Sequence, residues 1–172
     1  MKKQHFFLAC FFYAIAVFYL AAITPITAHE AKILYTSNDI VSTLMRWGDS
    51  LGMGFIGFRA FFLFFGFLSI GLFYELSRRH FKKDEDVYLS TLIFMFLPGI
   101  LTATTLANVS IIVLPLVLLF VLLHEKGHYL FLPPIMLALF FIHEASIIFF
   151  VAVLLYALMH KEKKLFIISN SI

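Results

Sequence analysis

The feature that most constrains this chain is a succession of long apolar runs separated by short polar segments. Six runs can be read, covering roughly residues 6–23, 53–74, 87–104, 109–123, 130–142 and 146–159. The first three are close to the ~20 residues that a helix needs to cross a hydrocarbon core. The fourth and fifth are short, so we expect them to be tilted or partly re-entrant. The pattern predicts an all-α, polytopic membrane bundle of about six transmembrane helices, in a single domain over residues 1–172.

Composition indicates that lipid is the solvent. The chain is 62% hydrophobic and 13% charged, and it contains 23 phenylalanines. A soluble domain carries about 25% charged residues, so this chain lacks the polar surface to cover its apolar mass in water. Cys10 is the single cysteine, which excludes a disulfide framework within the chain. The lipid bilayer is therefore its first expected partner.

The positive charges predict the orientation of the spans. With six spans and both termini in the cytoplasm, ten of the 13 Lys and Arg residues are cytoplasmic: Lys2, Lys3, Arg78, Arg79, Lys82, Lys83, Lys126, Lys161, Lys163 and Lys164. This is the positive-inside bias of multi-pass membrane proteins. The net charge of +3 thus reflects topology and gives no indication of nucleic-acid binding. The first apolar run exceeds the 7–15 residues of a signal-peptide core, which favours an uncleaved anchor.

The polar interval over residues 24–59 is the strongest candidate for a functional site. Its apolar residues between positions 31 and 44 have the spacing of a helix lying along the membrane interface, and Trp47 would sit at the headgroups. Glu30 follows the first span, and Arg59 enters the second. A carboxylate flanked by apolar surface is a candidate for a raised pKa, which suits a general base. Arg59 should pair with a carboxylate or bind an anion such as phosphate. The alternative is an amphipathic connector with solvated charges.

Three short segments carry a resemblance to a known superfamily. They are Thr-Ala-His-Glu-Ala-Lys at 27–32, Gly-Phe-Arg-Ala at 57–60 and Arg-Arg-His-Phe at 78–81. Their order around two spans resembles the N-terminal half of the C-type membrane glycosyltransferases (GT-C), which include protein O-mannosyltransferases and lipid A aminoarabinose transferases. The resemblance implies an enzyme that transfers a sugar from a polyprenyl-phosphate donor at the outer face of a bacterial inner membrane.

The resemblance also implies roles for individual residues. Glu30 matches the acidic residue at the catalytic centre, where it would deprotonate the acceptor or bind a divalent metal ion. His29 stands where an aspartate is common, and Arg59 matches an arginine that would neutralise the lipid phosphate. Asn108 replaces a second acid expected between spans three and four, and it would orient substrate. Apart from the resemblance, the predicted topology puts Glu144 in a short outer turn on the same side as Glu30, where it would help to build the same pocket. A polar cap on a helix hairpin is the simpler interpretation.

The chain has about half the spans of such enzymes. This favours a truncated or split homologue whose missing spans come from a second chain. The alternative function is a non-catalytic polytopic membrane subunit or a transporter fragment, with the outer loop as a docking surface.

A competing motif is His124-Glu125-Lys126-Gly127-His128, which fits His-Glu-x-x-His. On a helix, His124 and His128 would share one face and bind zinc, as in an intramembrane metalloprotease. Against this, Gly127 favours a turn, Lys126 places a cation in the site, and no aspartate follows Asp86. We expect a charged turn between spans four and five.

Overall fold

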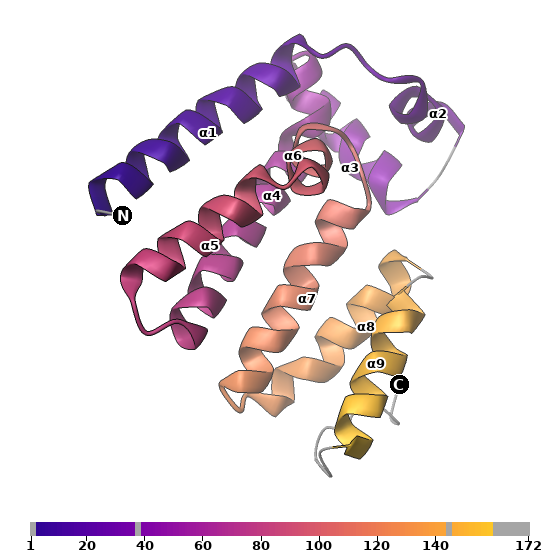
Figure 1. Ribbon diagram of the computed structural model, residues 1–172. Coiled ribbons are helices and arrows are strands. Elements are labelled where there is room, and N and C mark those ends of the chain that lie inside the picture. Colours follow the sequence, from indigo (N-terminus) through magenta and orange to yellow (C-terminus); the bar gives the residue numbers. More distant parts are fainter. Residues whose placement is uncertain (1–2, 37–38, 144–145, 160–172) are drawn as a thin grey trace. The chain divides into compact units, whose positions relative to one another are not determined.

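In the computed structural model, residues 3–36, 39–143 and 146–159 are described, and all their regular structure is helical (Figure 1). The helices are α1 (Lys3–Ile23), α2 (Ala28–Thr36), α3 (Ile40–Asp49), α4 (Phe55–His80), α5 (Asp84–Phe96), α6 (Pro98–Thr105), α7 (Ser110–Glu125), the 3₁₀ turn η1 (Tyr129–Phe131), α8 (Leu132–Ile142) and α9 (Ser146–Met159). The predicted all-α class is confirmed for this part of the chain.

Two helices, α1 and α4, are long and apolar enough to cross a membrane. A third span is available if α5 and α6 are taken together, because the pair is apolar enough but bent by 60°. The bend lies at Leu97, just before Pro98, whose ring cannot continue a helix and whose missing N–H removes a hydrogen bond. Pro98 lies within the third apolar run, 87–104, so a proline accounts for the break in this run. The other apolar helices, which end the described chain, are shorter.

The helix over the second apolar run continues six residues beyond that run. Helix α4 continues from Tyr74 to His80 through a polar last turn that contains Arg78 and Arg79. Cations at the C-terminus of a helix interact favourably with its dipole and with its last carbonyl groups. Charged residues therefore extend this helix beyond the point where hydrophobicity alone would end it.

The chain forms two compact units, residues 1–115 and 116–172. In the first, α4 packs against α1, α3, α5 and α6, and α2 packs against α3. The core of this unit is a cluster from four helices: Tyr13, Val17, Ala21, Leu63 and Met95, with Leu101 at its edge. In the second unit, α8 packs against α9 and against η1.

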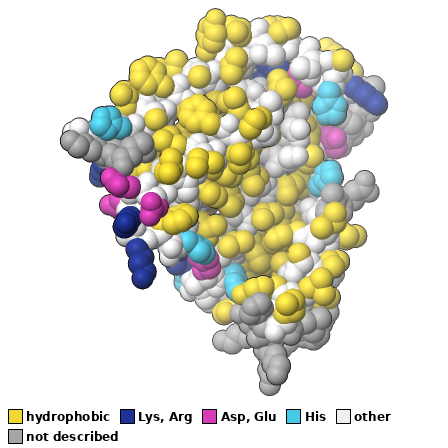
Figure 2. Space-filling model, in the orientation of Figure 1, with side chains coloured by type: hydrophobic (Ala, Val, Ile, Leu, Met, Phe, Trp, Pro, Cys, Tyr) yellow, Lys and Arg dark blue, Asp and Glu magenta, His cyan; other side chains and the backbone are white. Residues whose placement is uncertain are grey.

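The surface is largely apolar. Figure 2 shows hydrophobic side chains over most of the visible face. Along α1, Phe7, Phe11, Phe12 and Tyr19 are each more than half exposed, from 57% to 62%. An exposed apolar band of this length on a helix indicates that lipid, and not water, surrounds it.

The first polar loop differs from its prediction. Instead of one amphipathic helix over residues 31–44, the structure has two helices, α2 and α3. Helix α3 starts at Ile40 because Asp39 caps it: the Asp39 carboxylate accepts a hydrogen bond of 2.8 Å from the backbone N–H of Ser42. Aspartate is among the best N-cap residues, and it favours a new helix start over continuation of the old one.

Candidate functional site

The centre of the first unit's polar loop is a buried ion pair between Glu30 and Arg59. Each residue is 1% exposed, and Arg59 Nη2 lies 2.7 Å from Glu30 Oε2. A second hydrogen bond of 2.9 Å joins Arg59 Nε to Glu30 Oε1, so the contact is bidentate. The expectation that Arg59 pairs with a carboxylate is therefore confirmed. Such fork-to-fork pairs are the strongest of the charged hydrogen bonds.

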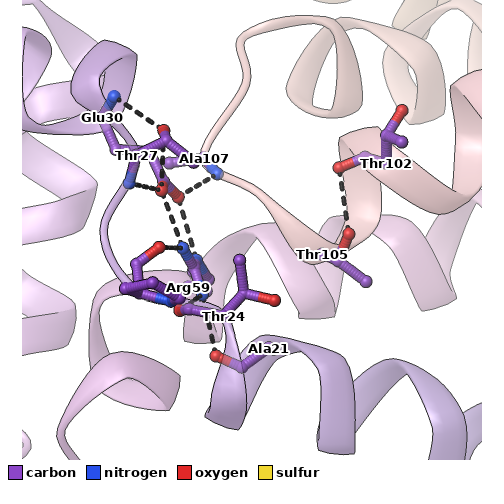
Figure 3. Close-up of polar contacts among 9 residues, drawn as sticks. Ala21, Thr24, Thr27, Glu30, Arg59, Thr102, Thr105 and Ala107 are labelled. Atoms are coloured by element: carbon purple, nitrogen blue, oxygen red, sulfur yellow. Dashed lines mark hydrogen bonds and ion pairs between the residues drawn. The ribbon is translucent and has the colours of Figure 1, made fainter.

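The remaining donors of Arg59 close the C-terminal end of α1. Nη1 donates to the carbonyl oxygens of Ala21 and Thr24 at 2.9 and 2.7 Å, and Nη2 donates to that of Pro25 at 3.1 Å. The last carbonyls of a helix have no partner within it and carry its negative dipole end. With the two bonds to Glu30, all five N–H groups of Arg59 are used. A residue of α4 thus serves as the C-terminal cap of α1 (Figure 3).

The Glu30 carboxylate is equally occupied. Besides Arg59, Oε1 accepts the backbone N–H of Ala107 at 2.9 Å, and Oε2 accepts the backbone N–H and the hydroxyl of Thr27 at 2.9 and 3.0 Å. A carboxylate offers roughly four lone-pair sites, and Glu30 accepts five hydrogen bonds, so all of its sites are occupied. Within the described structure, no acceptor position of Glu30 remains open for a substrate.

Thr27 explains why Glu30 lies where it does. The Thr27 hydroxyl accepts the backbone N–H of Glu30 at 3.2 Å, while the Glu30 side chain returns to the backbone N–H of Thr27. This reciprocal arrangement is a capping box, in which Thr27 is the N-cap and Glu30 the third residue of α2. Thr27 was not among the candidate residues predicted from the sequence, although Thr-x-x-Glu is the sequence signal for a helix that starts with a capping box.

The electrostatics of Glu30 contradict one expectation. Burial raises the pKa of this carboxyl, but the hydrogen bonds from Arg59, Ala107 and Thr27, with the positive charge of Arg59, outweigh burial and lower it to about 2. The raised pKa expected of a general base is wrong because the apolar surroundings come with a bidentate cation. A carboxylate held this firmly in its ionised form is a weak proton acceptor at neutral pH.

Of the other candidate residues, His29 and Asn108 each adjoin a residue of the Glu30 network in the chain. His29 is exposed one position before Glu30 in α2. Asn108 is half-buried and directly follows Ala107. Its side-chain oxygen accepts a hydrogen bond of 2.9 Å from the backbone N–H of Ser110, the first residue of α7. Glu144 lies outside the described residues.

The His-Glu-x-x-His motif does not lie on one helix. Helix α7 ends at Glu125, and Gly127 has a φ of +72°. The backbone N–H of His128 bonds to the carbonyl of Leu123 at 2.9 Å, and that of Gly127 to the carbonyl of His124 at 3.0 Å. These two bonds form a Schellman motif, the usual glycine-dependent helix ending. The predicted turn is confirmed, and His124 and His128 do not share a helical face.

The described residues contain no cluster of three or more His, Cys, Asp and Glu side chains suited to a metal ion. His124 instead meets two tyrosine rings edge-on, Tyr129 at 5.8 Å and Tyr156 at 5.9 Å between ring centroids. No protein-family model, curated protein or solved structure matches this chain.

Proposed function

We propose that this chain is a GT-C-like membrane module that holds a polyprenyl-phosphate-linked sugar at the outer face of a bacterial inner membrane. The supporting observation is the network around Glu30. It ties the acidic motif of the first outer loop, the arginine of α4 and the segment after α6 into one hydrogen-bonded unit. The resemblance to glycosyltransferases assigns substrate contacts to the same three segments.

In this proposal the Glu30–Arg59 pair positions the backbone of the site, and His29 is the general base. Glu30 has its acceptor positions filled, whereas His29 is exposed on the same turn of α2. Histidine is the commonest general base in enzymes. The role of base that the resemblance suggested for Glu30 is thereby transferred to its neighbour, at the position where the related enzymes commonly have an aspartate.

The topology belongs to the same proposal. The spans would be α1, α4, α5 with α6, α7, η1 with α8, and α9, with both termini in the cytoplasm. Helices α2 and α3 would then lie at the outer membrane surface. The 16 residues of α7 rise only about 24 Å as a helix, less than a core of ~30 Å. Local thinning of the bilayer or flanking polar residues would accommodate the difference.

A second candidate, a non-catalytic membrane subunit, is favoured by one observation. The hydrogen-bonding groups of Glu30 and Arg59 are used by each other and by neighbouring protein groups, so the role of the pair in the described structure is architectural. In that case the exposed parts of α2 and α3 dock a partner chain that supplies further spans.

The test uses the full chain in nanodiscs. Trp47 is the single tryptophan and is 61% exposed on α3, so its fluorescence reports binding near the loop. We expect a polyprenyl-phosphate sugar to change this fluorescence, and a suitable acceptor to release free polyprenyl phosphate, measured by mass spectrometry. His29→Ala should abolish release and leave both binding and the denaturation midpoint unchanged. If the wild-type protein shows neither binding of the donor nor release of polyprenyl phosphate, the enzyme proposal is refuted and the non-catalytic membrane subunit remains as the interpretation.

A further inference from the structure

Helix α2 has a buried side and an exposed side. Glu30 and Leu34, four residues apart, are 1% and 8% exposed and belong to the buried side. His29, Lys32 and Tyr35 are exposed and follow one another at intervals of three residues. Residues three or four apart are neighbours on the surface of a helix, so these three form a row on the opposite side. His29, the base of the proposed function, lies at one end of the row, and Tyr35 lies at the other.

Tyr35 differs from the exposed rings of α1 in its surroundings. It is 79% exposed, and within the described ranges no hydrogen bond or ring contact engages its side chain. The exposed rings of α1, such as Phe11 and Phe12, have apolar neighbours and face lipid. The row on α2 carries an imidazole and an ammonium group, which the apolar part of a bilayer excludes. Tyr35 is therefore an aromatic surface on a side of the helix that water or a polar ligand reaches.

Hydrogen bonds fix α2 near both of its ends. The capping box of Thr27 and Glu30 fixes its start. Near its end, Arg46 Nη2 on α3 donates to the carbonyl oxygen of Leu34 at 3.1 Å. This is one of the last carbonyl groups of the helix, which have no partner within it. The two ends of the exposed row are therefore held at a constant separation, and six residues of an α-helix rise about 9 Å.

An aromatic ring near a general base suits a sugar. A hexose has a face of C–H groups, and their slight positive charge is attracted to the negative face of an aromatic ring. Tyrosine provides this face at a low cost in conformational entropy, because its side chain has only two torsions to fix. A phosphate group has no such face. Of the polar parts of the proposed donor, Tyr35 therefore favours the sugar.

We propose that Tyr35 is a substrate-binding residue that stacks on the sugar of the polyprenyl-phosphate donor, so that the protein prefers a sugar-bearing lipid to the bare polyprenyl phosphate. This inference rests on the proposed function. The other role open to an exposed tyrosine beside a membrane is to anchor the protein at the lipid headgroups. Anchoring does not distinguish a lipid that carries a sugar from one that does not, so the two roles give different results.

The experiment measures two affinities of the full chain in phosphatidylcholine nanodiscs, one for undecaprenyl-phosphate glucose and one for undecaprenyl phosphate. The fluorescence of Trp47 reports both. We expect the wild type to bind the glucose-bearing lipid about fivefold more tightly, because an aromatic contact contributes about that factor in affinity. Tyr35→Ala should remove this preference and leave the affinity for undecaprenyl phosphate unchanged. Tyr35→Phe keeps the ring and should keep the preference.

The matched control is Tyr19→Ala, which removes a 62% exposed tyrosine from α1 and should change neither affinity. Because Tyr35 is exposed, Tyr35→Ala should also unfold at the wild-type midpoint. Equal binding of the two lipids by the wild type, or a preference that survives Tyr35→Ala, would overturn the inference and leave the proposed function in place. Equal losses of both affinities in Tyr35→Ala would overturn it in favour of membrane anchoring. A wild type that binds neither lipid would refute the proposed function itself.

Discussion

Arg59 Nη2 and Glu30 Oε2 lie 2.7 Å apart although 29 positions separate the two residues in the chain. Glu30 is the third residue of α2, and Arg59 lies in the first turns of α4 and reaches the end of α1. One contact therefore sets how the chain leaves its first apolar helix and enters the next long one. Whatever the loop binds, its backbone is positioned by this pair.

Replacing Glu30 by Gln should destabilise the protein strongly. The change removes one charge of a buried pair and leaves Arg59 uncompensated among backbone carbonyls, which typically costs about 3–5 kcal/mol. The measurement is the midpoint of thermal or denaturant unfolding of the purified protein in detergent.

The matched control for this variant is Glu75→Gln. Glu75 forms exposed pairs with Arg78 and Arg79 at 3.6 and 4.0 Å on the polar end of α4. Exposed pairs contribute about 0–1 kcal/mol, so this variant should unfold within that margin of the wild type. Equal effects of the two variants would show that the Glu30 pair is not buried.

The pair should also give a characteristic acid sensitivity. The pKa of Glu30 is about 2 in the folded protein against an ordinary value of 4.5. Because the folded-state pKa is the lower one, the stabilisation is complete above about pH 4.5 and is lost as the pH falls from there towards 2. The difference between the two pKa values corresponds to about 3 kcal/mol of unfolding free energy.

This acid loss is measured by following the unfolding midpoint between pH 7 and pH 3. Glu30→Gln removes the titrating group, so its midpoint should fall less steeply over the same interval. Parallel curves for the two proteins would assign the acid sensitivity to other carboxyl groups.

The fold was predictable from sequence to the extent that hydrophobicity determines it. The apolar runs predicted α1 and α9 closely, whereas the third run is broken at Pro98 into α5 and α6. The two helices of the first loop were not predicted, because Asp39 acts through a local hydrogen bond that does not alter the apolar spacing.

The sequence predicted which residues belong to the candidate site but not how they interact. Charge in an apolar chain identified Glu30 and Arg59 and predicted a partner for Arg59. The protonation preference of Glu30 depends first on the hydrogen bonds from Arg59 and then on the backbone N–H of Ala107, which lies 77 positions further along the chain. No local pattern contains that contact. Thr27, by contrast, could have been recognised from its capping-box spacing.

Gly66 should tolerate no side chain. A Cβ at this position of α4 would collide with the methyl and hydroxyl groups of Thr104 on α6. Overpacking of this kind typically costs about 1–3 kcal/mol, so Gly66→Ala should lower the unfolding midpoint. Gly71 lies on the same helix with nothing near its Cβ position, and Gly71→Ala should stabilise by up to about 1 kcal/mol.

A double variant identifies the cause. Thr104→Ala removes the two nearest colliding atoms, the methyl carbon and the hydroxyl oxygen, and leaves only the Cβ of residue 104 close to the new Cβ. Combining it with Gly66→Ala should therefore restore part of the lost stability. Additive losses in the double variant would mean that the close approach of α4 and α6 does not limit this position.

Gly127 distinguishes a helix ending from a metal motif. Its φ of +72° costs a residue with a Cβ about 1–2 kcal/mol, so Gly127→Ala should destabilise the turn after α7. Asparagine tolerates this conformation better, and Gly127→Asn should cost less. Both variants should leave the zinc content of purified protein at background. If residues 124–128 instead formed a zinc-binding helix, alanine would favour that helix, and Gly127→Ala would raise zinc content and stability together.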